Sequence, residues 1–380
     1  MSQPAPAPSP ATSAAERDDL RAMVRAFARD HFRLEEVRRV SGTEAGYDPA
    51  VWAGLGQLGL AGLLVPAAYG GAGCGLAEAG VILRELGRAL ACVPYLSSAV
   101  LAVTAVLASG DGEAQAELLP PLAAGELLAA VAVSGPAGRP DGTPASLGVA
   151  ASASRRGVSL DGEALYVVDG HVAGVLLVAA RDGTGTGLYQ VAGDAPGLSR
   201  AVMPAIDATR TLARLGFHAV PARLLGPPGS GAAALARVLD TAVAALAAES
   251  VGGSEEVLDL AVSHARQRVQ FGRPIGSFQA VKHKCADMLV ALEGARAALD
   301  GALEAADDPG SDAGIAALVA GLQCSAAYTH ITAEAIQVLG GIGFTWEHPA
   351  HLYFRRARTC AVLFGTETQH RAVLADRLGL

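Results

Sequence analysis

The sequence of 380 residues contains very little lysine and no pattern of cysteines, and both features restrict what the protein can be. Lys282 and Lys284 are its only lysines, and its formal net charge is −8. No basic stripe is present to neutralise phosphates, so we exclude nucleic acid as a partner. The five cysteines are scattered, without a Cys-x-x-Cys pair. This distribution fits a reducing compartment and predicts neither disulfides nor a metal site.

Long hydrophobic runs and a targeting segment are also missing. The longest apolar run, YLSSAVLAVTAVLAS from Tyr95, is shorter than the roughly 20 residues that a membrane helix needs. The N-terminus has no charged start followed by an apolar stretch, so it does not resemble a secretory signal. Its Pro, Ala and Ser content predicts a disordered lead-in over residues 1–15. We therefore expect a soluble, cytoplasmic protein without a membrane partner.

The sequence does show two changes of pattern, which predict three regions. Hydrophobic residues make up 51% of the chain and charged residues 17%, and Ala and Leu dominate, so helices should prevail. Residues 16–126 show the spacing of amphipathic helices. Residues 127–226 contain short Val-rich runs between Gly and Asp turns, which predict a β-domain. Its GTGTG segment, from Gly183, lies between two strand-like runs without a following helix, which favours a hairpin turn over a phosphate-binding loop.

Residues 227–380 predict a four-helix bundle. The first helix begins near Gly231. Ser277 and Ser311 are suitable N-caps for the second and third helices. Gly340 begins a Gly-Gly pair that would end the third helix, and the last helix begins near Thr366. The predicted fold is mainly α with a central β-domain.

Two long motifs carry a resemblance to a known family. The segments ARQRVQFGRPIGSFQAVKHKCADM (residues 265–288) and QVLGGIGFTWEHPAHLYFRRAR (residues 337–358) resemble signatures of the acyl-CoA dehydrogenase family. Upstream, WAGLGQLGLAGLLVPAAYGGAG and LRELGRALACVPYLSS are similar to its N-terminal helical domain. The resemblance extends over the chain from about residue 16. It implies an N-terminal helical domain, a β-barrel and a C-terminal four-helix bundle, assembled as a tetramer built of dimers.

The resemblance also implies a reaction and a cofactor arrangement. In this family a Glu removes a proton α to the thioester carbonyl of an acyl-CoA substrate, and a hydride passes from the β-carbon to N5 of FAD. FAD lies at a dimer interface, where one chain supplies the base and a β-domain surface. The neighbouring chain lends an Arg, a Phe, a Gln and a Gln-x-x-Gly-Gly turn to the adenine and pyrophosphate end. The usual electron acceptor is an electron-transfer flavoprotein.

The positions that a chain lends to its neighbour's cofactor are intact in this sequence. Arginine suits a pyrophosphate because its planar fork can bridge phosphate oxygens. A Gly-Gly turn lets backbone amides approach an anion closely. A solvated helix face for the Arg and Gln positions, and simple packing for the Phe, are the alternatives. The six matching positions are Arg268, Phe271, Gln279, Gln337, Gly340 and Gly341.

The positions that contact a chain's own flavin are altered. The family's Thr-Glu-Pro segment appears as VAVSGP, where Ser134 keeps a hydroxyl but Gly135 replaces the Glu. The Trp-Ile-Thr segment appears as YVV, where Tyr166 keeps an aromatic ring but Val168 cannot donate a hydrogen bond to the flavin. Thr366 keeps the Thr of the Glu-Gly-Thr loop.

The catalytic base is missing from both positions that the family uses. Phe364 occupies the usual position, and Ala242 occupies the alternative one, 26 residues before Arg268. Glu367 is a candidate for a displaced base, although the first turn of a helix favours a carboxylate for electrostatic reasons alone. Glu249, in the first bundle helix, is expected to be a buried, hydrogen-bonded carboxylate.

Three hypotheses follow. In the first, the chain is the base-lacking subunit of a heteromeric acyl-CoA dehydrogenase and completes the FAD site of a paralogous partner, as in members that act on sterol side chains or other bulky acyl-CoA substrates. In the second, the chain forms a homotetramer and Glu367 or another acid is the base. In the third, it is a non-catalytic relative that binds acyl-CoA or acts as a scaffold.

Overall fold

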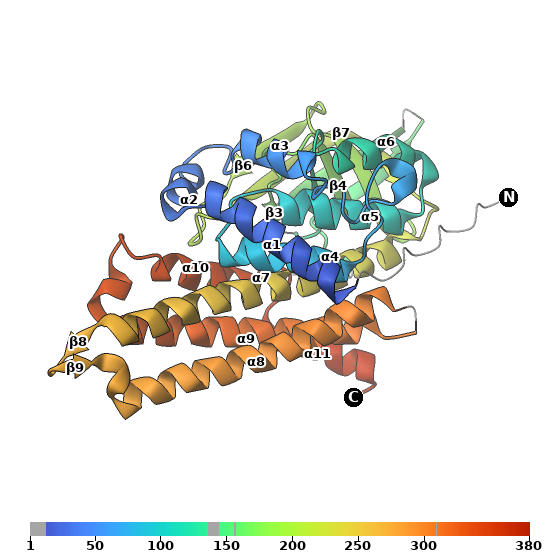
Figure 1. The fold of residues 1–380 in the computed structure, drawn as a ribbon. Coiled ribbons are helices and arrows are strands. Elements are labelled where there is room, and N and C mark those ends of the chain that lie inside the picture. Colours follow the sequence, from blue (N-terminus) through green and yellow to red (C-terminus); the bar gives the residue numbers. More distant parts are fainter. Residues whose placement is uncertain (1–12, 136–143, 156, 309) are drawn as a thin grey trace.

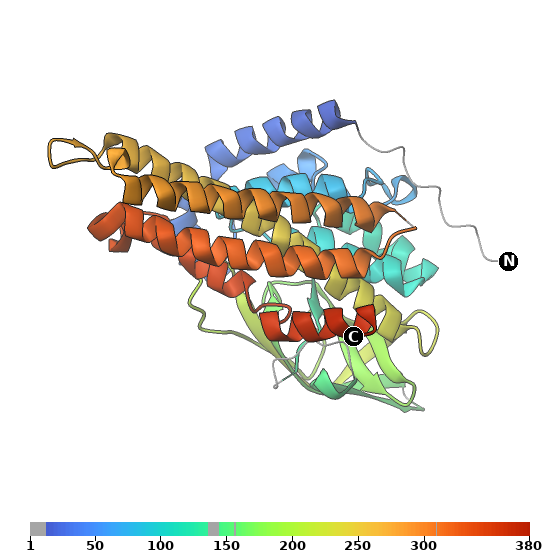
Figure 2. The same cartoon turned by 90° about the horizontal axis from the view of Figure 1, so that it is seen from below.

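The computed structural model describes residues 13–135, 144–155, 157–308 and 310–380, so the predicted lead-in lies almost entirely outside the described residues. Helices on one side and a β-domain behind them rest on a long helical bundle (Figures 1 and 2). The prediction of a mainly α fold with a central β-domain is confirmed.

The N-terminal region is built of helices, three of which begin at a polar side-chain cap. Ser13 and Glu16 form a capping box at the first helix, and Asp48 and Asp111 cap two others. The apolar run from Tyr95 is a fully buried π-helix that continues as an α-helix. The elements are α1 (Ala14–His31), α2 (Leu34–Ser41), α3 (Pro49–Gln57), η1 (Ala67–Tyr69), α4 (Leu76–Arg88), η2 (Tyr95–Ala102), α5 (Val103–Ser109) and α6 (Gly112–Ala123).

The β-domain is a small barrel. The strands are β1 (Ala129–Ala132), β2 (Val149–Ser154), β3 (Gly157–Val168), β4 (Val175–Asp182), β5 (Gly185–Ala192), β6 (Leu198–Val202) and β7 (Leu212–Leu225). Their pairings run β4-β2-β3-β7-β5 and return to β4, with a single residue pair joining β2 to β4. A second hydrophobic core fills its interior. The GTGTG segment forms the turn of the β4–β5 hairpin with its first two residues and begins β5 with the other three, so the predicted hairpin turn is confirmed.

The bundle consists of long helices. The sequence prediction of the residues that cap two of them is wrong. Its helices are α7 (Gly231–Gln267), α8 (Gln279–Asp307), α9 (Ala313–Leu339), α10 (Ala350–Cys360) and α11 (Glu367–Leu378). Ser277 does not cap α8, because its hydroxyl donates to the Pro274 carbonyl at 2.7 Å within a preceding 3-10 turn, η4 (Ile275–Ser277). At α9, Asp312 rather than Ser311 is the cap and accepts from the Ile315 amide at 3.0 Å.

Helix α7 connects the N-terminal helices with the bundle, because it packs against α4 as well as against α8 and α9. A Cβ at Gly252 would lie 1.8 Å from the Arg84 carbonyl oxygen, so only glycine permits this approach of α4. By length and composition α7 and the segment Ala313–Phe344 could each cross a membrane. However, 67% and 50% of their most apolar windows are buried within the protein, which is typical of core helices.

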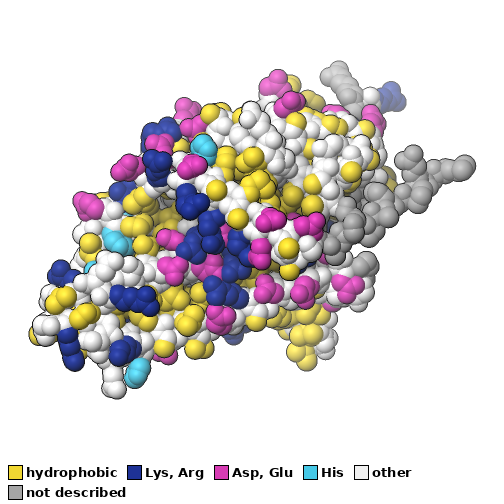
Figure 3. Space-filling model, viewed as in Figure 1, with side chains coloured by type: hydrophobic (Ala, Val, Ile, Leu, Met, Phe, Trp, Pro, Cys, Tyr) yellow, Lys and Arg dark blue, Asp and Glu magenta, His cyan; other side chains and the backbone are white. Residues whose placement is uncertain are grey.

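Ion pairs connect the N-terminal helices to the bundle. Glu255 on α7 is buried and accepts hydrogen bonds from Arg84 on α4 and Arg296 on α8. Arg88 on α4 also donates to Asp259 on α7, at 2.6 Å. Figure 3 shows basic and acidic side chains interleaved across the middle of one face of the molecule. The N-terminal region is therefore fixed to the bundle.

Candidate functional site

The loop that carries the usual base position is packed as part of the core. Phe364, between α10 and α11, is only 7% exposed. Its carbonyl accepts a hydrogen bond from the Nε2–H of His370 at 3.1 Å. Burial lowers the pKa of the His370 imidazole, against the opposing effect of this hydrogen bond. Thr366 is the N-cap of α11 and forms a capping box with Gln369. The loop is thus rigid and apolar where a carboxylate would be needed.

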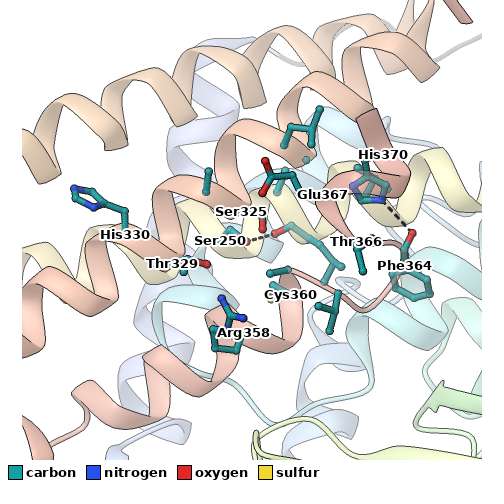
Figure 4. Close-up of a pocket in the computed structure, with 18 residues that line it drawn as sticks. Ser250, Ser325, Thr329, His330, Arg358, Cys360, Phe364, Thr366, Glu367 and His370 are labelled. Atoms are coloured by element: carbon teal, nitrogen blue, oxygen red, sulfur yellow. Dashed lines mark hydrogen bonds between the residues drawn. The ribbon is translucent and has the colours of Figure 1, made fainter. Parts of the chain in front are cut away.

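A cavity of about 400 Å³ lies beside this loop, between α7, α9, α10 and α11 (Figure 4). Phe364, Glu367 and His370 line it together with Ser250 and Arg358. The Glu367 side chain is 65% exposed and forms an ion pair with Arg371 one turn along α11, at 2.6 Å. The displaced-base candidate therefore reaches a cavity, but as a solvated and paired carboxylate.

Ala242 does not contribute to this cavity. It is completely buried within α7, in the main hydrophobic core. Neither of the family's base positions therefore presents a carboxylate.

Two of the altered β-domain positions lie together. The Leu165 amide donates to the carbonyl of Ser134 at 3.0 Å, which places Ser134 beside the next residue, Tyr166. Tyr166 is 43% exposed and has a φ of 57°, in the left-handed region. Val168 is buried and faces the centre of the molecule, where a group of charged residues lies.

That group is a buried ion network that joins the bundle to the β-domain. Arg356 on α10 donates to Asp207 at 2.8 Å and to the Thr209 carbonyl at 2.8 Å. Arg210 forms an ion pair with Glu249 on α7, and Arg356 lies 3.6 Å from the same carboxylate. Burial opposes the charge on Arg356, but Asp207 and Glu249 outweigh it and raise the pKa of Arg356. The prediction that Glu249 is a buried, hydrogen-bonded carboxylate is confirmed.

The network leaves almost no free space next to Val168. The remaining gap, lined also by Tyr95, Leu96 and Asp169, has a volume of about 20 Å³. Such a gap holds roughly one water molecule. Asp169 accepts a hydrogen bond from the Ser97 hydroxyl at 2.5 Å, and burial raises the pKa of its carboxyl group. An aromatic ring system of flavin size does not fit in this space.

The far end of the bundle is exposed, in contrast to the filled space beside Val168. A tight hairpin follows α7 there. Arg268 is the C-cap of α7 and is exposed. The hairpin strands are β8 (Val269–Gln270) and β9 (Arg273–Pro274). Phe271 and Gly272 form its turn with φ values of 52° and 78°. The Phe271 side chain is 93% exposed. A positive φ is unfavourable for a residue with a side chain, and such strained residues are more frequent at functional sites than elsewhere.

The remaining matched positions lie at the same end. Gln279 is the first residue of α8, and it is exposed. Gln337 lies on the last turns of α9, and Gly340 ends this helix with a φ of 65°, as predicted. Gln337, Gly340 and Gly341 are all exposed. Both views show the β8–β9 hairpin and the end of α9 at one end of the bundle (Figures 1 and 2). The six positions are therefore exposed at the same end of the bundle.

The sequence did not predict the buried ion network as a unit. Its members Asp207 and Arg210 lie in the loop before β7. Asp207 precedes Arg356 by 149 residues in the sequence. The only local signal was a charged DATR segment in an otherwise apolar region. Nothing in the spacing pairs this segment with the RRAR segment of α10.

Comparison with known proteins agrees with this architecture. Residues 14–126 match the model of the acyl-CoA dehydrogenase N-terminal domain, and residues 229–379 match that of the C-terminal domain. The acyl-CoA dehydrogenase IpdE2 of Mycobacterium tuberculosis is 37% identical over 92% of this chain and 92% of its own length.

Solved structures are similar over nearly the whole chain. A chain of a Tcur3481-Tcur3483 steroid ACAD variant has a TM-score of 0.87 and 34% identity, and the match covers 97% of this chain and 99% of that one. A chain of the ChsE4-ChsE5 complex from Mycobacterium tuberculosis has a TM-score of 0.88 and 28% identity, with 97% and 98% covered. The protein described here therefore belongs to the acyl-CoA dehydrogenase family of FAD-binding flavoproteins, oxidoreductases that act on CH–CH bonds.

Proposed function

We propose that this chain is one subunit of a heteromeric acyl-CoA dehydrogenase and that it completes the FAD site of a paralogous partner. The observation that carries the proposal is the contrast between two places in the molecule. The residues that would be lent to a partner are exposed at one end of the bundle, whereas the gap beside Val168, the altered flavin-contact position, is only about 20 Å³ and is lined by the ion network. A chain without a base would also be a poor enzyme alone, since general-base catalysis contributes about 10²- to 10⁴-fold.

The residues at the open end fit the phosphate and adenine end of FAD. Arg268 would hold the pyrophosphate through its planar guanidinium group. Gln337 and Gln279 offer amide groups that both donate and accept hydrogen bonds. Gly340 and Gly341 have open space where a Cβ would be, which leaves their backbone accessible to an anion. When FAD is bound, it supplies the hydride acceptor, and the base beside it belongs to the partner.

The relatives support a heteromeric assembly and a bulky substrate. One similar structure is named as a complex of two chains, ChsE4 and ChsE5, and another as a steroid ACAD. We propose a sterol-derived or similarly bulky acyl-CoA as the substrate and a cytoplasmic mixed tetramer as the active form. The electron acceptor in this proposal is an electron-transfer flavoprotein.

One observation favours a second candidate, a homomeric enzyme in which Glu367 is the base. Glu367 lines the 400 Å³ cavity, as a base would have to. Its exposure and its pairing with Arg371 argue against this role, because a catalytic carboxylate is normally desolvated and shifted toward the operating pH. If the chain were a non-catalytic scaffold, the exposed residues that match the family's contacts to a neighbouring chain's cofactor would have no role.

Substitution of single carboxylates separates these candidates. In the mixed assembly with a paralogue that carries Glu at the position of Phe364, we expect Glu367→Gln to change kcat by less than about twofold. Glu→Gln in the partner should lower kcat by about 10²- to 10⁴-fold. Steady-state turnover with FAD content measured in parallel provides the test.

Arg371→Gln is the matched control, because it breaks the same ion pair but keeps the Glu367 carboxylate. If Glu367→Gln abolished turnover with FAD still bound while Arg371→Gln did not, the base would lie in this chain and the proposed division of labour would be wrong.

A further inference from the structure

A second cavity lies where the N-terminal helices meet the bundle. It has a volume of about 260 Å³, and residues of α1, α4, α7 and α10 line it (Figure 1). It shares no lining residue with the cavity beside the Phe364 loop. Ligand sites usually combine a mainly apolar wall with a few polar groups. The apolar wall of this cavity consists of buried or half-buried side chains, among them Ala28, Phe32, Leu34, Val37, Leu90 and Leu260.

The polar groups of this cavity include three arginines, Arg25 and Arg29 on α1 and Arg88 on α4. Arg29 is exposed, and the side chains of Arg25 and Arg88 are 45% and 25% exposed. The guanidinium groups therefore lie toward the solvent and the apolar wall lies deeper. This arrangement matches a ligand that has a charged end and an apolar body.

Two of the three arginines are already paired. Arg25 donates to both carboxylate oxygens of Glu85, at 2.7 and 2.8 Å. Arg88 forms an ion pair with Glu256 at 3.0 Å. Arg29 forms no ion pair with the residues that the structure describes. It is therefore the positive charge that remains available to a ligand.

Glu85 and Glu256 also line the cavity, and their negative charges oppose the entry of an anion. Arg25 occupies both oxygens of Glu85. Burial raises the pKa of the Glu256 carboxyl group, against the effect of Arg88, and this weakens the opposition from Glu256. With all five groups ionised, three positive charges face two negative ones. The net charge at the cavity still favours an anion.

We propose that this cavity binds a medium-chain carboxylate of about eight carbon atoms, with the carboxylate at Arg29 and the chain against Phe32 and Leu260. The volume sets the length of the chain. A water molecule takes up about 30 Å³ of liquid, so the cavity holds about nine non-hydrogen atoms. Arginine suits the charged end because its planar fork binds both oxygens of a carboxylate. Removal of the chain from water drives the binding of the apolar end.

Calorimetric titration of the purified chain with sodium octanoate tests this site. We expect a dissociation constant of about 0.1–1 mM, a usual affinity for a ligand of about ten non-hydrogen atoms. Arg29→Gln should weaken binding by about tenfold or more, because a hydrogen bond to a charged group is lost. The unfolding temperature should not change, since Arg29 is exposed. Acetate lacks the chain and 1-octanol lacks the charge, so both should bind at least about tenfold more weakly than octanoate.

Arg21→Gln is the matched control, since Arg21 lies on the same helix but pairs with Asp18 and does not line the cavity. It should leave the affinity for octanoate unchanged. Octanoate bound equally well by Arg29→Gln would lie elsewhere in the molecule, and the inference would be wrong. It would also be wrong if 1-octanol bound as tightly as octanoate, or if about 10 mM octanoate gave no binding heat. None of these results bears on the proposed function.

Discussion

Arg356→Met is expected to lower the free energy of unfolding by about 3–5 kcal/mol, the usual cost of removing one partner from a buried ion pair. Arg356 is 3% exposed, and among the residues that the structure describes its removal leaves the Asp207 carboxylate with Thr209 and the Glu249 carboxylate with Arg210. Methionine keeps most of the side-chain volume, so the loss reports the missing charge rather than a cavity. Chemical denaturation, with the midpoint and slope both recorded, measures the effect.

Arg377→Met is the control for this experiment. Arg377 pairs with Asp240 at 2.9 Å, with side chains that are 28% and 21% exposed. A partly solvated pair of this kind contributes at most about 1 kcal/mol. Equal losses for Arg356→Met and Arg377→Met would show that the central network does not hold the domains together.

Arg268→Ala is expected to weaken FAD binding to the mixed assembly by about 10- to 150-fold. This range corresponds to about 1.5–3 kcal/mol, the contribution of a hydrogen bond to a charged group. The guanidinium at the end of α7 is exposed, so the isolated chain should keep its stability. Equilibrium titration of FAD, monitored by flavin fluorescence at saturating partner concentration, measures the effect.

Arg266→Ala provides the comparison, since Arg266 is exposed two residues earlier in the last turn of α7. We expect it to change the FAD affinity by less than about twofold. Equal effects of the two substitutions would indicate a general loss of positive charge instead of a specific contact at Arg268.

Local patterns predicted the order of elements, because periodicity and glycine breaks depend on neighbouring residues. Gly340 ends α9, and the GTGTG segment forms a hairpin turn, both as predicted. Helix starts were less predictable. Ser277 has the side chain of a cap, but the 3-10 turn before α8 uses its hydroxyl for the Pro274 carbonyl. Which of two adjacent polar residues caps a helix depends on the path of the preceding loop.

The candidate site was predictable only where it follows a continuous motif. The six exposed positions that match the family's cofactor contacts lie in two contiguous segments, so continuous motifs were enough to predict them. The buried network joins Asp207 and Arg210 of the β-domain with Glu249 and Arg356 of the bundle. Such pairings depend on the tertiary arrangement and have no sequence period. Phe364 indicated that a base was missing, but only the structure shows that charged side chains fill the space beside Val168.

The flavin content and native mass of the purified protein test the central claim most directly. The chain should be purified alone and also after co-expression with a paralogue that carries Glu at the position of Phe364. The proposed function predicts a colourless single chain and a yellow mixed tetramer with one FAD for every two chains. A yellow homotetramer of this chain, with one FAD for each chain, would contradict it.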